Sequence, residues 1–416
     1  SLSTGFGPGN ILVTARLKNF GSNFIDSVFV NWSVNNVNQG GRWVVTNMDT
    51  SGRPSNELNI NLGNYNFGAG TFTVKAWTSR PNNQNDTVNI NDTFTFTGST
   101  KLGGTYTLNN AQPTAGTNFN SFTDLANALN TVGVCAPVIV NVVSGSGPYN
   151  SRFVLGSIPG ASAVNTITIN GNGRALQYNS TAAADAQIVV FNGTRYVTIN
   201  NLVIKALSST YGWGVAIAGD SRYDTIRNCH IDLSTITGAS STNSNGITIS
   251  GSVTSPTATG LNSNIYIEGN LIDAGHPTTN GGAYYGITVY GSSSSTFGAD
   301  SIWLVNNEIK NYYYMGIYTY YTNEVHIIGN NLHRPLKTAT TTVYGIYTYY
   351  MGRGSVKRNR LHDFTAPTVS HTNSVYAIYL NYPNYSSSVP KRTYEVSNNA
   401  IYNVGGGGIK IGRAHV

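Results

Sequence analysis

Charged residues are scarce in this sequence: Asp, Glu, Lys and Arg make up only 10% of the 416 residues. This composition argues against a protein built from long surface helices, whose outer faces need charged side chains. The 24 basic residues exceed the 17 acidic ones, but they are scattered and do not form the stripe that nucleic acid requires. We therefore attribute the net charge of +7 to a shortage of acidic residues and expect no nucleic-acid partner.

Cysteine and long apolar runs are also lacking. Cys135 and Cys229 are too few for a disulfide framework and are not spaced like metal ligands, so we interpret both as small buried apolar residues. No apolar run reaches the length of a membrane span, and the chain does not begin with a basic-then-apolar leader. We expect no membrane insertion, and we expect Ser1 to be either a mature N-terminus after leader removal or an internal point of a longer protein.

The chain is rich instead in Gly, Ser, Thr, Asn and Tyr, with 46 glycines and 27 tyrosines. These residues favour many short strands closed by tight turns. A length of 416 residues is too great for one compact core and favours several domains, or one domain followed by a solenoid. The composition predicts an all-β, extracellular protein.

Residues 1–98 are predicted to form a β-sandwich. Apolar residues alternate in short runs, such as 11–17, 28–34 and 72–77, and turn clusters separate these runs. About seven strands fit into this length. The motifs KNFGS at 18–22, NWSVN at 31–35 and NDT at 91–93 resemble Ig-like modules of the CARDB kind, which occur in large bacterial surface proteins.

Residues 99–104 are predicted to be a linker, and a short amphipathic helix is predicted near residues 121–130. Ser121 is a helix start signal. The apolar residues that follow at helical spacing are Phe122, Leu125, Ala126 and Leu129. We expect this helix to cover the N-terminal end of the next domain, where the first strands would otherwise have an unpaired edge.

One pattern recurs from Val197 onward: apolar, any, apolar, any, any, Asn, any, apolar. The copies that carry the asparagine place it at Asn270, Asn307, Asn330, Asn359 and Asn399. Two earlier copies have Leu202 and Cys229 at that position. The shortest spacing, from Asn307 to Asn330, is 23 residues. This is about one turn of a parallel β-helix, and longer spacings indicate loops inserted into a turn.

Stacked turns place equivalent residues about 4.8 Å apart, so the five asparagines should form a buried structural ladder in which each amide bonds the next. A second strand recurs between the copies and begins with Gly-Ile or Ala-Ile at residues 246, 286, 316, 345, 377 and 408. Its isoleucines should point inward and the residues after them outward. Residues 105–416 are therefore predicted to form a parallel β-helix.

This repeat resembles the pectate-lyase-like right-handed parallel β-helix superfamily over residues 105–411. The lead-in GTYTL at 104–108 and the segment GVCAPV at 133–138 are similar to β-helix regions of large bacterial secreted surface proteins. The resemblance implies a bacterial protein that is extracellular or on the cell surface. Proteins of this kind are mostly adhesins or have no assigned function.

Chemistry on this fold requires clustered acidic residues. The residues three positions beyond the ladder form one column: Lys205, Asp232, Asp273, Lys310, His333 and His362. Asp232 and Asp273 should lie about 5 Å apart, close enough for paired catalytic carboxylates, with Lys310 as a candidate base. The alternative is a solvated column of charges that pair across strands. The Asn-Thr-Asp and Asp-Asp signatures of pectin-cleaving families are missing.

Asp220 and Asp224 are the candidates for a bound metal ion, which would be Ca²⁺. The alternative is that both residues cap a turn. We expect no other cofactor or metal.

The string GIYTYY occurs at residues 316–321 and 345–350, with a relative, AIYLNY, at 377–382. Stacking predicts three outward columns: Tyr318, Tyr347 and Tyr379; Tyr320 and Tyr349; Tyr321, Tyr350 and Tyr382. An exposed tyrosine surface of this size suits contact with sugar rings or with another protein. The alternative is that the chain's own long loops at 335–343 and 366–375 cover it.

These features favour a non-catalytic extracellular protein, adhesive or structural, that contacts its partners through the tyrosines. The partners expected are other copies of the chain, other surface proteins or polysaccharide. No cap follows the last turn at 405–411, and an open β-helix end is a template for further strands, so the hypothesis includes a subunit of a self-assembling surface fibre. The alternatives are a polysaccharide lyase or glycoside hydrolase, and a non-catalytic carbohydrate-binding protein.

Overall fold

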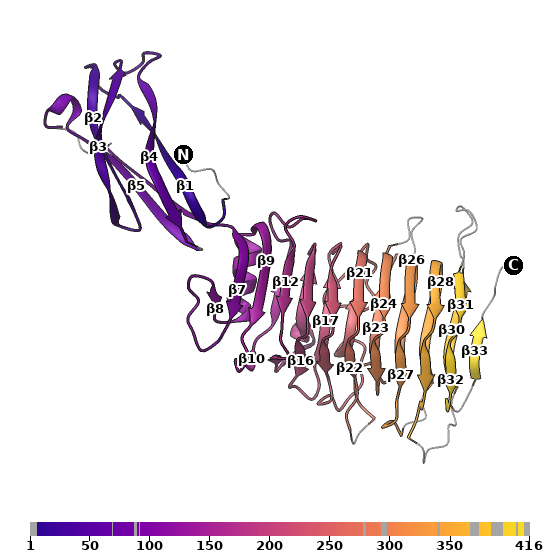
Figure 1. The fold of residues 1–416 in the computed structure, drawn as a ribbon. Coiled ribbons are helices and arrows are strands. Elements are labelled where there is room, and N and C mark those ends of the chain that lie inside the picture. The colour runs from indigo at the N-terminus through magenta and orange to yellow at the C-terminus, as the bar shows by residue number, and fades with distance from the viewer. Residues whose placement is uncertain are drawn as a thin grey trace. The chain divides into compact units, whose positions relative to one another are not determined.

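The computed structural model describes residues 6–68, 70–86, 90, 92–277, 280–292, 298–338, 342–366, 374–383, 394–404 and 407–411. The chain divides into two compact units. The first extends to Gly103 and includes Ala115–Thr117 and Val132–Ala136, and the second holds the remainder from Gly104 onward. Strands make up nearly all of the regular structure (Figure 1). Within these described ranges, no helix has the length and apolar character needed to cross a membrane.

The first unit is an antiparallel β-sandwich (Figure 1). Its smaller sheet pairs β1 (Gly9–Lys18) with β4 (Glu57–Phe67). Its larger sheet has the order β3 (Val37–Met48), β2 (Ile25–Val34), β5 (Thr71–Ser79) and β6 (Thr93–Ser99), and the 3-10 helix η1 (Pro81–Asn83) lies between β5 and β6. Two apolar clusters lie between the sheets. One buries Val13 and Phe67 of the smaller sheet with Val34 of the larger sheet, and the other buries Leu17 with Val30. The described residues of this unit form six strands, where the sequence predicts about seven.

The segment 99–104, expected to be a linker, is mostly strand. Ser99 ends β6, and Leu102 begins β7 (Leu102–Leu108). Thr100, between the two strands, is buried. Its hydroxyl accepts a hydrogen bond from the Gly70 N–H at 2.9 Å and donates one to the Gly68 carbonyl at 3.1 Å. These hydrogen bonds fix a glycine-rich segment whose composition alone predicts a flexible linker.

The predicted helix is confirmed as α1 (Phe122–Thr131). Ser121 Oγ accepts a hydrogen bond from the Asp124 N–H at 3.1 Å, as expected of an N-cap residue. The apolar residues predicted for its inner face are all buried: Phe122, Leu125, Ala126 and Leu129. The ring of Phe122 lies edge-on to Tyr149 and Phe153, with centroids 5.3 and 5.1 Å apart. The helix therefore covers the first turns of the β-helix.

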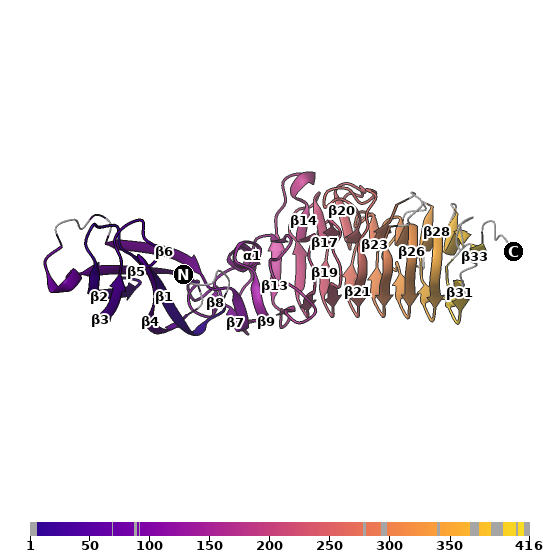
Figure 2. The same cartoon turned by 90° about the horizontal axis from the view of Figure 1, so that it is seen from above.

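The second unit is a parallel β-helix, as predicted, and most turns contribute three strands that stack in three columns (Figures 1 and 2). The first column contains β9 (Val134–Val142), β12 (Ile167–Asn170), β15 (Val197–Asn200), β18 (Thr225–Arg227), β21 (Ser263–Glu268), β24 (Asp300–Val305) and β31 (Tyr394–Ser397). The second contains β10 (Tyr149–Asn150), β13 (Ala175–Tyr178), β16 (Val203–Ala206), β19 (His230–Asp232), β22 (Leu271–Asp273), β25 (Glu308–Lys310), β27 (Asn331–His333), β29 (Arg360–His362) and β32 (Ala400–Tyr402). The third contains β11 (Phe153–Leu155), β14 (Gln187–Asn192), β17 (Gly212–Ala218), β20 (Ser244–Ile249), β23 (Tyr285–Tyr290), β30 (Val375–Pro383) and β33 (Gly407–Ile411).

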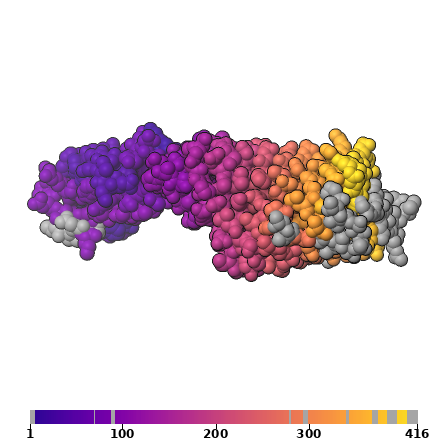
Figure 3. Space-filling model, turned by 90° about the horizontal axis from the view of Figure 1, so that it is seen from below, coloured from indigo at the N-terminus to yellow at the C-terminus, as the bar shows by residue number. Residues whose placement is uncertain are grey.

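Two long strands, β26 (Met315–Ile328) and β28 (Val343–Lys357), each run from the third column of one turn into the first column of the next. The short β8 (Asn118–Phe119) pairs with β7 at the N-terminal end, and the 3-10 helix η3 (Ala183–Asp185) precedes β14. In the space-filling view the colour changes in bands along this unit, because each turn lies beside the next one in sequence (Figure 3).

The inside of the β-helix is filled by isoleucine columns, as the alternation predicts. The isoleucines of the third strands are in register and fully buried: Ile247, Ile287, Ile317, Ile346 and Ile378. Burying such columns away from water supplies the main favourable term for stacking the turns.

The five asparagines occupy one column between the first and second strands of each turn. In Asn307, Asn330, Asn359 and Asn399, Oδ1 accepts two hydrogen bonds from the preceding asparagine, one from its backbone N–H and one from its Nδ2, at 2.9–3.1 Å. Each Nδ2 also donates to a backbone carbonyl, for example Asn307 to Ile267 at 2.8 Å. The Cys229 N–H donates to Asn270 Oδ1 at 2.9 Å and extends the ladder by one turn. The buried amides are thereby satisfied.

Candidate contact surface

Tyrosines on the third strands of consecutive turns form two outward columns. Tyr318, Tyr347 and Tyr379 are in register on β26, β28 and β30, with ring centroids 5.5 and 4.9 Å apart. Tyr320 and Tyr349 are in register beside them, with centroids 5.0 Å apart and planes within 5° of parallel. The structure therefore brings together the tyrosines that the sequence assigned to these columns.

The third predicted column contains Tyr321, Tyr350 and Tyr382. Adjacent rings lie 4.5 Å apart with interplanar angles of 16° and 2°. All three residues have left-handed backbone conformations, with φ values of 47°, 52° and 53°. A residue with a side chain adopts this conformation at a cost of about 1–3 kcal/mol. The strain falls where the chain bends out of the third column, and stacking of the three rings offsets part of it.

Sequence reasoning missed the tyrosines that directly precede the Gly-Ile or Ala-Ile pair. Tyr344 and Tyr376 are in register with ring centroids 5.0 Å apart, and Tyr285 lies 5.6 Å from Tyr318. Strict alternation would turn these residues inward. A Cβ at the glycine between the tyrosine and the isoleucine would point into the core, at Gly345 toward Leu361. The glycine and the isoleucine therefore both face inward, and this break in the alternation leaves the tyrosine on the outer face.

We define the tyrosine surface as the connected set of stacked and edge-on rings on these turns. Its members are Tyr284, Tyr285, Tyr290, Tyr313, Tyr314, Tyr318, Tyr320, Tyr321, Tyr344, Tyr347, Tyr349, Tyr350, Tyr376, Tyr379 and Tyr382.

The rings of the tyrosine surface cover one another, so the predicted columns are half-buried. Burial raises the pKa of Tyr290 and of Tyr344 to about 12, and it also raises the pKa of Tyr318 and Tyr347. In the preceding turn the position of Tyr318 is taken by Thr288, which is fully buried. The loops expected as a cover were 335–343 and 366–375, and of these residues 339–341 and 367–373 lie outside the described residues.

The inner rings of the columns have neighbours on both faces. Tyr320 lies between Tyr290 and Tyr349, with centroids 4.3 and 5.0 Å away. Tyr350 lies between Tyr321 and Tyr382, each 4.5 Å away. What such rings present away from the sheet is their edges and hydroxyl groups. Chemically the surface offers hydrogen-bonding groups and ring edges rather than open flat faces.

The candidate catalytic residues lie in one column on the second strands. Asp232 and Asp273 are register neighbours, but each binds a different lysine. Lys205 Nζ lies 2.9 Å from Asp232 Oδ2, and Lys310 Nζ lies 3.0 Å from Asp273 Oδ2. Burial opposes ionisation of Asp232, yet hydrogen bonds from Ser234 and Lys205 hold its pKa below the usual value. A general acid needs the opposite shift, so the arrangement matches cross-strand charge pairing.

The two candidate Ca²⁺ ligands, Asp220 and Asp224, differ in burial. Asp224 is fully buried, and its two carboxylate oxygens accept hydrogen bonds from the Val197 N–H at 2.9 Å and from Thr194 Oγ1 at 2.5 Å. Burial raises its pKa to about 7. Asp220 is exposed. Both Asp224 oxygens hold the turn, which fits the capping interpretation. Over the ranges that the structure describes, no group of three or more His, Cys, Asp or Glu side chains could hold a metal ion.

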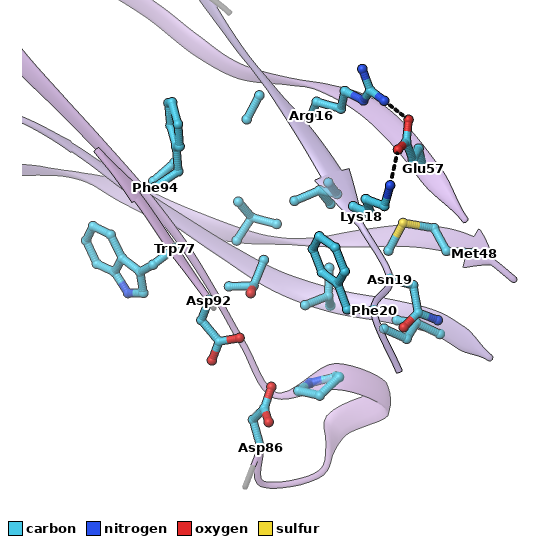
Figure 4. A pocket seen from close by; sticks show the side chains of 18 of the residues that line it. Arg16, Lys18, Asn19, Phe20, Met48, Glu57, Trp77, Asp86, Asp92 and Phe94 are labelled. Atoms are coloured by element: carbon cyan, nitrogen blue, oxygen red, sulfur yellow. Dashed lines mark hydrogen bonds and ion pairs between the residues drawn. The ribbon is translucent and has the colours of Figure 1, made fainter. Parts of the chain in front are cut away.

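Sequence reasoning also missed a cleft in the β-sandwich, because strand alternation does not reveal which sheet edges stay open (Figure 4). The cleft has a volume of about 1180 Å³ and is lined by residues of all six strands of the sandwich and of the segment 19–24, both apolar and polar. Figure 4 shows Trp77 and Phe94 on one side and Arg16 and Lys18 on the other, both bound to Glu57. Phe94 is 69% exposed. The cleft suits an apolar group.

Comparison with known proteins finds similarity of fold only. No family model matches the chain, and no curated protein matches it. Among solved structures, it is similar to a pectin methylesterase from Aspergillus niger at 12% identity and a TM-score of 0.40, over 72% of this chain and 86% of that one. It is similar to an alginate lyase from Paenibacillus at 14% identity and a TM-score of 0.32, over 74% and 99%. It is also similar to PfbA, a surface adhesin of Streptococcus pneumoniae, at 13% identity and a TM-score of 0.34, over 70% and 89%. With identities and TM-scores this low, none of these similarities bears on what this chain does or binds.

Proposed function

We propose that this chain is a non-catalytic extracellular protein, adhesive or structural, whose β-helix contacts other proteins, including further copies of itself, through the tyrosine surface. The observation that carries the proposal is the stacking of tyrosines in register over consecutive turns. Tyrosine is enriched, and charged residues are depleted, at the centres of protein interfaces.

The orientation of the rings favours a protein over a sugar as the bound partner. A sugar ring binds an aromatic side chain by lying on its flat face, where the π electrons are. The faces of Tyr320 and Tyr350 are already covered by neighbouring rings. A sugar would have to displace one of these neighbours. The hydroxyl groups can instead donate to and accept from the backbone of a partner protein.

The alternative is a polysaccharide lyase or glycoside hydrolase that uses Asp232, Asp273 and Lys310. It has weaker support, because each aspartate is held in an ion pair and the pKa of Asp232 is lowered. A carboxylate in such a pair does not readily carry the proton that a general acid delivers. A carbohydrate-binding protein without catalysis remains the other alternative.

The family of the two domains belongs to the same proposal. We infer a β-helix of the pectate-lyase-like superfamily, right-handed as in large bacterial secreted surface proteins, preceded by an Ig-like module of the CARDB kind. The antiparallel sandwich and the parallel stack support this assignment. Assembly of copies into a surface fibre belongs to the same proposal, with pairing at a strand edge as a second mode of contact beside the tyrosine surface.

An adhesion assay tests the proposal. Beads coated with the purified chain are expected to aggregate, and beads coated with the double variant Tyr320→Arg, Tyr349→Arg are expected to stay dispersed, because the added charges repel across the contact. Tyr266→Arg is the matched control, since Tyr266 is an exposed tyrosine outside the tyrosine surface, and its beads should aggregate like the wild type.

Two results would favour the alternatives instead. Dispersed wild-type beads, together with glycan-array binding that the double variant loses, would favour the carbohydrate-binding alternative. Cleavage of an acidic or neutral polysaccharide that is lost in Asp273→Asn would favour the enzyme.

A further inference from the structure

We propose that the tyrosine surface is a site of oxidative coupling, in which Tyr350 forms a carbon–carbon bond to Tyr321 or Tyr382 and so joins successive turns of the β-helix covalently. This inference concerns a chemical modification of the chain and does not depend on the identity of any binding partner.

Tyr350 has three tyrosine rings around it at coupling distance. The Tyr321 and Tyr382 rings are stacked on it with centroids 4.5 Å away. The Tyr349 ring lies edge-on to it at 4.4 Å. The parallel strands β26, β28 and β30 hold these rings in place. Two reacting groups fixed at short distance couple far faster than the same groups free in solution.

The described part of the chain offers no other covalent link between turns. Cys135 and Cys229 are both free thiols, so no disulfide joins one turn to another there. Tyr350 is half-buried rather than enclosed, which leaves part of its side chain in reach of a small oxidant. The reaction begins with loss of a hydrogen atom from the Tyr350 phenol.

The coupling balances with one peroxide as oxidant. Tyr350 and its neighbour each lose the phenolic hydrogen, as one electron and one proton, and become phenoxyl radicals. The radicals combine through the ring carbons ortho to oxygen, and the hydrogen on each of these carbons moves to oxygen, which restores both aromatic rings and both hydroxyls. In total two ring C–H bonds break and one C–C bond forms. The two electrons and two protons reduce one hydrogen peroxide to two waters, with a haem peroxidase as catalyst.

The test treats the full chain with a peroxidase and limiting hydrogen peroxide. Dityrosine fluorescence is measured in the monomer band of a denaturing gel, and the cross-linked peptides are mapped by mass spectrometry through their loss of two hydrogens. We expect cross-linked peptides that pair Tyr350 with Tyr321 or Tyr382. Tyr350→Phe keeps the stacked ring but cannot form a phenoxyl radical, and it should lower the monomer fluorescence by more than half.

Tyr266→Phe is the control, because Tyr266 stacks on Trp303 and not on a tyrosine, and its fluorescence should equal that of the wild type. Peptide mapping of the wild type tests the proposal even if Tyr350→Phe fails to fold. Cross-links that avoid Tyr350, cross-links found only between chains, or monomer fluorescence unchanged in a folded Tyr350→Phe would each overturn it.

Discussion

Asn307 and Asn330 share two hydrogen bonds across adjacent turns: Asn330 Oδ1 accepts from the Asn307 backbone N–H at 2.9 Å and from Asn307 Nδ2 at 3.0 Å. These two hydrogen bonds fix which residue of one turn lies beside which residue of the next. A slip of one residue would move every outward side chain inward. The ladder therefore sets the register that stacks Tyr318 on Tyr347.

Asn330→Ala should lower the free energy of unfolding by about 3 kcal/mol or more, because several buried polar partners lose their bonds at about 1–3 kcal/mol each. The groups that lose a bond include the Asn307 backbone N–H, Asn307 Nδ2 and the Leu304 carbonyl. Asn399→Ala should cost less, since Asn399 is only half-buried and water can replace its bonds. Urea unfolding of both variants measures the difference, and equal losses would contradict a buried ladder.

Gly316→Ala tests the close approach of the third strand to the second. A Cβ at Gly316 would lie 2.5 Å from Leu332 Cδ2 and 2.7 Å from the Gly345 carbonyl oxygen. We expect a loss of about 1–3 kcal/mol, as for other overpacked cores. Gly238→Ala is the control, because nothing lies within 4 Å of its added Cβ. A thermal midpoint for Gly316→Ala equal to that of the wild type would show that the strands are not this close.

Asp224 should make stability depend on pH. Burial raises its pKa to about 7 from the ordinary 3.8, so between these values the folded state binds the proton more tightly than the unfolded state. The stabilisation from the protonated carboxyl is full below the unfolded pKa and is lost as the pH rises through about 7. Asp224→Asn removes this titration. Thermal midpoints of the two proteins should therefore diverge with rising pH in favour of the variant, and parallel profiles would contradict the raised pKa.

The cleft of the β-sandwich should bind an amphiphilic fluorescent dye such as an anilinonaphthalene sulfonate. Phe94→Glu should weaken dye binding severalfold without unfolding the sandwich, because Phe94 lines the cleft but is mostly exposed. Trp43→Glu is the matched control, since Trp43 is exposed at 46% and does not line the cleft. Equal dye binding by both variants would place the dye elsewhere.

Features that follow from the repeat could be predicted from the sequence. The asparagine positions fixed the register, and the register placed Tyr318 beside Tyr347 and Asp232 beside Asp273. Features that depend on local departures from the repeat could not. The break in strict alternation at the glycine that follows Tyr344 leaves Tyr344 on the outer face. The pairing of Asp273 with Lys310 depends on side-chain conformations, which a sequence pattern does not contain.

Sedimentation velocity of the wild type and of the double variant Tyr320→Phe, Tyr349→Phe tests the contact role most directly. Phenylalanine keeps each ring and its stacking but removes the hydroxyl group. If the contact uses ring edges and hydroxyls, the variant should self-associate about tenfold more weakly, since each lost hydrogen bond is worth about 0.5–1.5 kcal/mol. Self-association of equal strength in both proteins, or none in the wild type, would contradict this use of the tyrosine surface.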